Sequence, residues 1–221
     1  FREIHESSKA ETGSTAEAMA GVPADVSHIA LHALFERPVQ KQVVELLLLE
    51  AEHQKFTSCV VVHGMGGTGK TVTAVAAVQH TAVRRHCSDI YWLTVGADAV
   101  GAKLRQLAAM LYKQLSGKEA KAPQQKDEHE WQQLLVQAMA GKQRALLVLD
   151  DPWMPEQIRA LNPIDGAETE SRLLVTTRIR DLVPKATRVE LPLMGKDEAV
   201  ALLLDLANVD EASYIKDNPG S

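Results

Sequence analysis

The chain has 221 residues, 45% of them hydrophobic, and a formal net charge of −5 at pH 7. This length suits one α/β domain with flanking segments, and the negative charge argues against broad binding to nucleic acid, which requires a basic surface. No apolar run approaches the roughly 20 residues that a membrane-spanning helix needs, so we expect no membrane contact.

The first predicted elements lead up to a glycine-rich stretch. Residues 1–20 are rich in Ser, Ala, Glu, Thr and Gly without apolar periodicity, which predicts a flexible linker. A helix is predicted over 39–53. A strand is predicted over 58–63, where a run of β-branched apolar residues indicates burial on both faces of a parallel sheet. A helix of small residues is predicted over 72–78.

Strands and helices then alternate along the rest of the chain. Further strands are predicted over 90–95, 145–149, 173–177 and 187–191. Apolar residues at steps of three or four predict helices over 100–115, 131–138 and 197–204, and an exposed loop is predicted over 116–127. This alternation favours right-handed crossovers. The predicted fold class is therefore α/β, a doubly wound parallel sheet of about five strands with helices on both faces.

The decisive motif follows the strand at 58–63. It matches the phosphate-binding pattern G-x-x-x-x-G-K-[ST] and comprises Gly64, Met65, Gly66, Gly67, Thr68, Gly69, Lys70 and Thr71. The glycines let backbone N–H groups approach phosphates, and the helix that begins near Gly69 adds its positive end. Lys70 can reach the β- and γ-phosphates, and the Thr71 hydroxyl can take one position around Mg²⁺. With Val72, these residues are predicted to bind the nucleotide of a P-loop NTPase.

Charged residues follow two later strands. Asp150 and Asp151 end the run ALLVL, at the edge of the sheet where the phosphate loop also lies. Asp150 is the predicted partner of Mg²⁺, and Asp151 could orient or deprotonate an attacking water. Arg178 follows LLVTT and could sense a γ-phosphate with its planar guanidinium. The residues alone leave open that the acids merely end a strand and that the arginine is solvated.

Several blocks in this order resemble the NB-ARC domain of the STAND class, the nucleotide switch of plant disease-resistance proteins and apoptotic protease-activating factors. VHGMGGTGKT is similar to the family's phosphate loop, IYWLTVG to its second-strand block, LLVLDDPW to its kinase-2 block with Trp153, and SRLLVTTR to its sensor-arginine block. VELPLMGKDEAVALLLDLA resembles the segment that leads into the next subdomain. GVP and FERP resemble the segment beside the adenine, although FERP departs from the usual valine-glycine-arginine pattern.

The resemblance implies roles for further residues. Val22, Pro23 and Arg37 match the adenine segment, and Arg178 matches the γ-phosphate sensor. It also implies the family's behaviour: ADP held in an inactive state, exchange for ATP or dATP with Mg²⁺, at most slow hydrolysis, then self-association or contact with other domains to signal in immunity or apoptosis. By this resemblance, residues 21–195 form the nucleotide-binding subdomain and 196–221 begin a truncated helical subdomain.

Other readings remain open at this point. A metabolic ATPase or nucleotide kinase would need an acceptor pocket or an arginine-bearing lid, and no lid is evident. A transporter ATPase is disfavoured because its signature is incomplete at 115–117. The ATPase module of a transcription regulator and a purely nucleotide-binding, non-hydrolysing module are further alternatives. A chain that begins with Phe1 is expected to be part of a longer protein.

Few residues suggest any other chemistry. Two cysteines, Cys59 and Cys87, are too few for a disulfide framework and favour a reducing, cytoplasmic location. His28 and His32 have the spacing of a metal pair on a helix, but no third ligand lies nearby, so packing or surface roles are expected.

Overall fold

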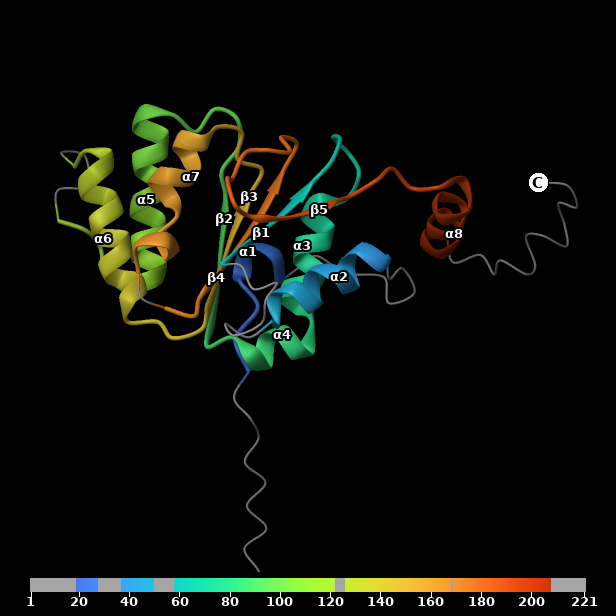
Figure 1. Ribbon diagram of the computed structural model, residues 1–221, viewed down its shortest axis with the longest axis horizontal. Helices are drawn as coiled ribbons and strands as arrows, with labels where there is room; N and C mark the ends of the chain where they lie inside the picture. The colour runs from blue at the N-terminus through green and yellow to red at the C-terminus, as the bar shows by residue number, and fades with distance from the viewer. Residues whose placement is uncertain (1–18, 28–36, 50–57, 122–125, 168, 208–221) are drawn as a thin grey trace, which may run out of the picture.

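The computed structural model describes residues 19–27, 37–49, 58–121, 126–167 and 169–207. Five parallel strands form one sheet in the order β2-β3-β4-β1-β5, and helices cover both faces (Figure 1). The strands are β1 (Cys59–His63), β2 (Asp89–Thr94), β3 (Ala145–Asp150), β4 (Arg172–Thr177) and β5 (Thr187–Glu190). This architecture confirms the predicted fold class, and each predicted strand boundary lies within one residue of the observed one.

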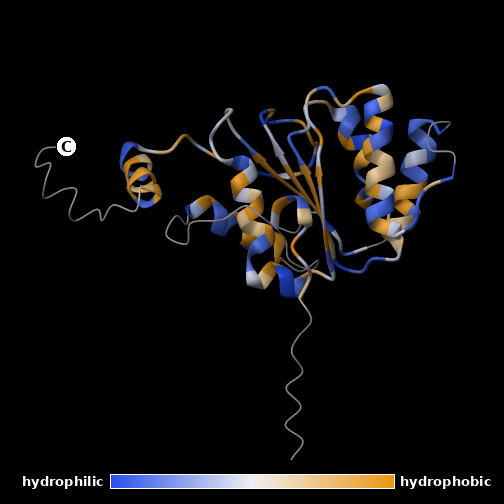
Figure 2. Cartoon of the chain, turned by 180° about the vertical axis from the view of Figure 1, so that it is seen from behind, coloured by the Kyte–Doolittle hydropathy of each residue, from blue (hydrophilic) through white to orange (hydrophobic). Residues whose placement is uncertain are grey.

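The inner strands are buried on both faces because their side chains alternate between two cores. Every residue of β1, β3 and β4 is buried. Val61 packs into one core, and its neighbours Val60 and Val62 pack into the other. In Figure 2 the strands form a hydrophobic layer between helices whose outward faces are hydrophilic. Such continuous apolar runs are typical of parallel sheets sandwiched between helices.

One face of the sheet carries α5 (Gly101–Ser116), α6 (Glu128–Ala140) and α7 (Pro155–Leu161). The apolar stripe of α5 is buried against this face, and the helix ends at Gly117, whose left-handed backbone (φ 68°) lets its N–H bond to Lys113 O. The Asp127 side chain accepts a hydrogen bond from Glu130 N, and the Glu130 side chain accepts one from Asp127 N, which fixes the start of α6.

The opposite face carries α1 (Ala24–Ser27), α2 (Pro38–Leu47), α3 (Lys70–Gln79) and α4 (Thr81–His86). The helix α8 (Lys196–Leu206) follows β5 and stands away from the sheet in Figure 1. Trp92 and Trp131 are core residues, with 2% and 1% of their surface exposed. Cys59 is also buried, which raises the pKa of its thiol to about 12.

Some elements differ from the sequence-based predictions. The helix α2 ends at Leu47, earlier than predicted, and the predicted positions 50–53 lie outside the described residues. The short helices α1, α4 and α7 were not predicted, since each is too short to display a clear helical period. Within the described residues, no helix combines the length and apolar composition needed to cross a bilayer. His28 and His32 lie outside the described residues.

Candidate nucleotide-binding site

The phosphate loop joins the end of β1 to the first turn of α3. Its turn requires glycine at Gly67 (φ 80°) and Gly69 (φ 94°), which adopt a backbone conformation that other residues rarely occupy. Gly64 is required for space, because a Cβ at this position would lie 2.5 Å from Leu191 O. Thr68 Oγ1 donates a hydrogen bond to Met65 O at 3.0 Å. These local constraints give the loop its closed shape at the N-terminal end of α3.

Lys70 lies inside this loop. Its Nζ donates a hydrogen bond to Met65 O at 2.7 Å, and the residue is buried. Burial lowers the pKa of the Lys70 amine, as does the charge of Arg178, whereas the carboxylates of Asp151 and Asp150 raise it. Met65 O is a neutral acceptor, whereas a bound phosphate would give the Lys70 ammonium an anionic one.

Asp150 is buried at the carboxyl end of β3 and accepts two hydroxyl hydrogen bonds on one oxygen. Thr71 Oγ1 donates to Asp150 Oδ1 at 2.9 Å, and Thr176 Oγ1 donates to the same atom at 2.5 Å. Burial raises the pKa of the Asp150 carboxyl, which these hydrogen bonds and the charge of Lys70 oppose. The strand register places Asp150 directly opposite Thr176, and the phosphate-loop helix brings in Thr71.

This donor set fits Mg²⁺. A hydroxyl and a carboxylate oxygen are ligands that Mg²⁺ accepts, and Mg²⁺ takes its remaining ligands from phosphate and water. No cluster of three or more His, Cys, Asp or Glu side chains suited to a metal occurs in the described part of the chain. Thr71 and Asp150 are thus the candidate protein ligands, in a site that a nucleotide would complete.

Arg178, just past β4, reaches across to the phosphate loop. A Cβ at Gly66 would lie 3.2 Å from Arg178 Nη1, so the guanidinium borders the loop backbone. Arg178 Nε lies 3.9 Å from Asp151 Oδ1. Asp151 has a positive φ of 56°, which its N–H stabilises by bonding to Thr176 O at 3.0 Å and to Thr176 Oγ1 at 3.1 Å. Two predicted site residues from different strands therefore meet beside the loop.

Arg37 is buried and binds backbone carbonyls on two segments. Its Nη1 donates to Thr68 O at 3.1 Å, and its Nη2 donates to Pro192 O at 3.1 Å. Nη2 also lies 3.6 Å from Glu198 Oε2, at the start of α8. The predicted adenine-segment arginine thus joins the phosphate loop to the segment between β5 and α8.

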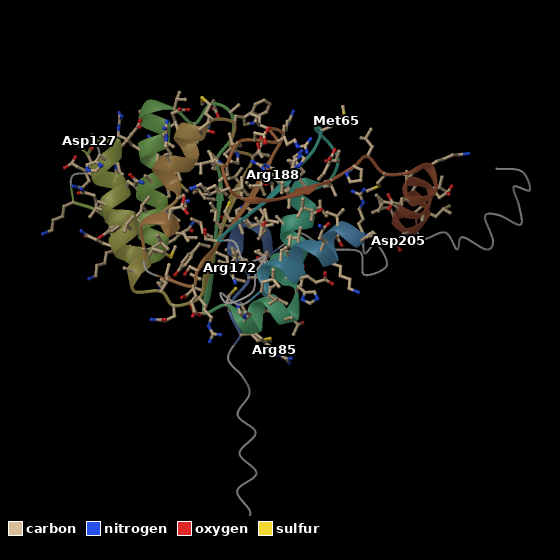
Figure 3. The ribbon with its side chains drawn as sticks, viewed as in Figure 1. Met65, Arg85, Asp127, Arg172, Arg188 and Asp205 are labelled. Carbon is tan, nitrogen blue, oxygen red and sulfur yellow. The ribbon has the colours of Figure 1, made fainter. Side chains whose placement is uncertain are left out.

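No recorded hydrogen bond among the described residues joins Val22 or Pro23 to the phosphate loop. Pro23 O accepts hydrogen bonds from the first turn of α1, and Ala20 N donates to Arg84 O in α4 at 2.7 Å. Figure 3 shows Arg85 of α4 at the end of the molecule opposite Met65. Val72 lies on α3 with 45% of its surface exposed, near the loop. Phe35 and Glu36 of the FERP block lie outside the described residues.

Two residues of the site were not singled out from the sequence. Thr176 links Asp150 and Asp151, and Gln157, which is 1% exposed, holds the backbone that follows β3. A signal for Thr176 existed, because a polar residue at the carboxyl end of a buried strand faces the site. Gln157 had no such signal, since its partners are backbone groups distant in sequence.

Comparison with known proteins gives a consistent result. A family model described as the NB-ARC domain matches residues 36–213. Apoptotic protease-activating factor 1 of Danio rerio is 30% identical over 152 residues, which are 65% of this chain and 12% of that protein. Disease resistance protein RPM1 of Arabidopsis thaliana is 28% identical over 167 residues, which are 72% of this chain and 18% of that protein. The chain thus spans less than a fifth of either relative.

Two solved structures share the fold. A STAND protein with a tetratricopeptide repeat sensor from Pyrococcus horikoshii has a TM-score of 0.52 and 20% identity, covering 83% of this chain and 27% of that chain. The ORC1 protein of Aeropyrum pernix, solved in complex with DNA, has a TM-score of 0.57 and 16% identity, covering 85% of this chain and 52% of that chain. These likenesses support the P-loop ATPase fold.

Proposed function

Because this chain belongs to the NB-ARC family, we propose that its nucleotide-binding module is a switch that holds ADP in one state and ATP with Mg²⁺ in another. The observation that carries the proposal is the buried junction at Asp150, where hydroxyls from the phosphate-loop helix and from β4 meet one carboxylate. A site for a metal-bound polyphosphate explains this junction better than a glycine-rich turn without a ligand does.

The proposed roles follow from where the charged groups lie. Lys70 and the loop backbone bind the phosphates. The positive N-terminal end of α3 also stabilises the negative charge of the phosphates. Thr71 and Asp150 would hold Mg²⁺, which would supply positive charge to neutralise the phosphates. Arg178 senses the γ-phosphate beside Gly66. Val72, and by family resemblance Val22, Pro23 and Arg37, are proposed to contact the nucleotide.

We propose that hydrolysis is slow. Asp151 is the candidate for orienting water, yet Arg178 competes for its carboxylate, because Asp151 Oδ1 lies 3.9 Å from Arg178 Nε. Slow hydrolysis suits a switch whose bound nucleotide carries the signal through different affinities for two conformations. Arg37 supports the proposed two-state switch, because it links the phosphate loop to the start of α8.

The wider setting is also a proposal. Relatives named for apoptosis and for disease resistance favour a role in signalling by self-association or by contact with other domains of a longer protein. A cytoplasmic location fits the low number of cysteines, Cys59 and Cys87, which are both buried. The acidic net charge argues against nucleic acid as a partner.

The deciding experiment identifies the nucleotide that leaves the purified protein on denaturation, by mass spectrometry, and titrates ADP and MgATP into the emptied protein. We expect bound ADP, and we expect Lys70→Ala to weaken ADP binding by about 10- to 100-fold, since a charge-assisted bond is lost. The control is Lys103→Ala, whose exposed amine pairs only with Asp98 at 2.6 Å among its recorded contacts. Unchanged ADP binding in Lys70→Ala, or rapid ATP turnover by the wild type, would refute the proposed switch.

A further inference from the structure

The guanidinium of Arg178 lies over an aromatic ring. Its Cζ is 4.9 Å from the centroid of the Trp153 ring, and its Nη1 would be 3.2 Å from a Cβ at Gly66. One side chain therefore borders both the loop after β3 and the phosphate loop. A planar guanidinium suits such stacking, because it meets the ring face while its N–H groups remain available at its edge.

Arg178 has few other constraints on its position. Its side chain is 49% exposed, and its one recorded charged partner, Asp151, is 3.9 Å away. A long exposed side chain loses rotamer entropy when it is held in one place, so an isolated arginine here would sample many positions. The Trp153 ring reduces this freedom by offering a flat surface next to the phosphate loop.

Trp153 is itself firmly held by a buried glutamine. Gln157 Oε1 accepts hydrogen bonds from Trp153 N at 2.7 Å and Met154 N at 3.1 Å. Gln157 Nε2 donates to Gly96 O at 2.9 Å and to Ala99 O at 3.1 Å. These four bonds tie the Trp153 backbone to the loop after β2. The loop cannot shift without leaving buried polar groups unpaired.

The ring is held by contact and not by a hydrogen bond. Its Nε1 is buried and has no hydrogen-bond partner among the described residues. The recorded partner of the indole is therefore the Arg178 cation over its face. A tryptophan kept for core packing alone would not need a cation over its ring.

We infer that Trp153 is a positioning residue for Arg178, holding the guanidinium against the phosphate loop where it meets the terminal phosphate of a nucleoside triphosphate but not of a diphosphate. This inference rests on the proposed function and deepens it, because it assigns the preference between the two nucleotides to an Arg178–Trp153 pair. Gln157 supports the pair by fixing the loop that carries the ring.

The test measures MgATP and ADP affinities by calorimetry for the wild type, Trp153→Leu, Trp153→Phe, Arg178→Ala and the Trp153→Leu/Arg178→Ala double variant. We expect Trp153→Leu to lower the ratio of ATP to ADP affinity by about two- to five-fold, the range of an exposed cation–π contact. Trp153→Phe, which keeps an aromatic face, should retain most of the ratio. Trp153→Leu should change nothing further once Arg178 is absent.

Tryptophan fluorescence gives a second readout. The other two tryptophans, Trp92 and Trp131, are fully buried in the two cores, so Trp153→Phe isolates the emission of Trp153 by difference. We expect MgATP and ADP to change this emission to different extents in the wild type, and equally in Arg178→Ala. This readout and Trp153→Phe decide the matter even if Trp153→Leu does not fold.

The outcomes separate the inference from the proposed function. Equal losses of ATP and ADP affinity in Trp153→Leu, or a fall in the ratio that persists without Arg178, would overturn the positioning role while nucleotide binding stands. A ratio unchanged in Arg178→Ala would overturn it too. A wild-type protein that binds neither nucleotide would overturn the proposed function, and the inference with it.

Discussion

Thr71 and Asp150 are 79 positions apart in the chain, yet Thr71 Oγ1 donates a hydrogen bond to Asp150 Oδ1 at 2.9 Å. The bond joins the first turn of α3 to the carboxyl end of β3. Because β4 lies between β1 and β3, the bond spans the central strand, and Thr176 of β4 donates to the same oxygen. The phosphate loop and the acidic strand end are therefore built as one unit.

The first prediction concerns the metal role of Asp150. In Asp150→Ala we expect the affinity for MgATP to fall by about 10- to 100-fold, the usual cost of losing a group that orients a metal site. ADP binding without metal should change much less. Calorimetric titrations with and without Mg²⁺ measure both values. Equal losses in the two titrations would argue against a metal role.

A second prediction concerns Arg37. In Arg37→Met the stem is kept, but Thr68 O and Pro192 O lose their donors and Glu198 loses its cation. We expect the free energy of unfolding to fall by about 3 kcal/mol, because two carbonyls lose hydrogen bonds from a buried charged donor, while the pair with the 42% exposed Glu198 adds little. Chemical denaturation measures this loss, and hydrogen exchange should rise in α8.

The matched control for Arg37→Met is Arg159→Met. Arg159 Nη2 pairs with Glu156 at 2.6 Å, but both side chains are largely exposed. Such a pair contributes at most about 1 kcal/mol. Similar losses of unfolding free energy in the two variants would show that the buried position of Arg37 adds no stability beyond that of an exposed ion pair.

Gly64 gives a prediction that rests on the space around it and on its positive φ of 158°. A Cβ at Gly64 would lie 2.5 Å from Leu191 O, whereas a Cβ at Gly195 meets nothing within 4 Å. We expect Gly64→Ala to lower the free energy of unfolding by about 1–3 kcal/mol, the usual cost of overpacking. Gly195→Ala, at an ordinary backbone φ of −62°, should be nearly neutral. Thermal melts of both variants measure the difference, and equal melting temperatures would contradict the steric argument.

A pH dependence is expected from His63, which ends β1 next to the phosphate loop. Burial lowers the pKa of its imidazole, as do the charges of Arg180 and Arg188, while Glu190 and Asp181 raise it. Above both the folded and the unfolded pKa the ring is neutral in each state and contributes nothing. As pH falls through the ordinary value of about 6.5, the unfolded chain takes up a proton first, so stability decreases.

The measurement for His63 is chemical denaturation between pH 8 and pH 5, a span of about three units around that ordinary value. In His63→Gln we expect the free energy of unfolding to fall less steeply with acidification than in the wild type, because one group that titrates differently in the two states has been removed. An identical slope in both proteins would contradict the assignment to His63.

Much of the nucleotide site could be predicted because its parts are contiguous in sequence. The motif from Gly64 to Thr71 contains its own turn, its cation and its hydroxyl, and it lies between a strand and a helix as predicted. Asp150 could be predicted because the apolar run of β3 ends at a carboxylate. Local composition and period determine such features, since each is complete within about ten residues.

The adenine side could not be predicted in the same way. Arg37 is predicted beside the base, and its guanidinium bonds to Thr68 O and Pro192 O, which lie 31 and 155 positions away in the chain. Val22 is predicted there as well, and Ala20, two residues before it, bonds to α4. Motif resemblance names such residues without saying what they touch, so the base contacts stay a prediction.

The sequence by itself determined the strands, most of the helices, the phosphate loop and the family, because periodicity and motif spacing are properties of short contiguous segments. Only the tertiary structure decided that β4 lies between β1 and β3, which brings Thr176 to Asp150, and that Gln157 holds Trp153 beneath Arg178. Strand order and register depend on how two cores are filled at once. No local pattern encodes them, since the contacting residues are far apart in the chain.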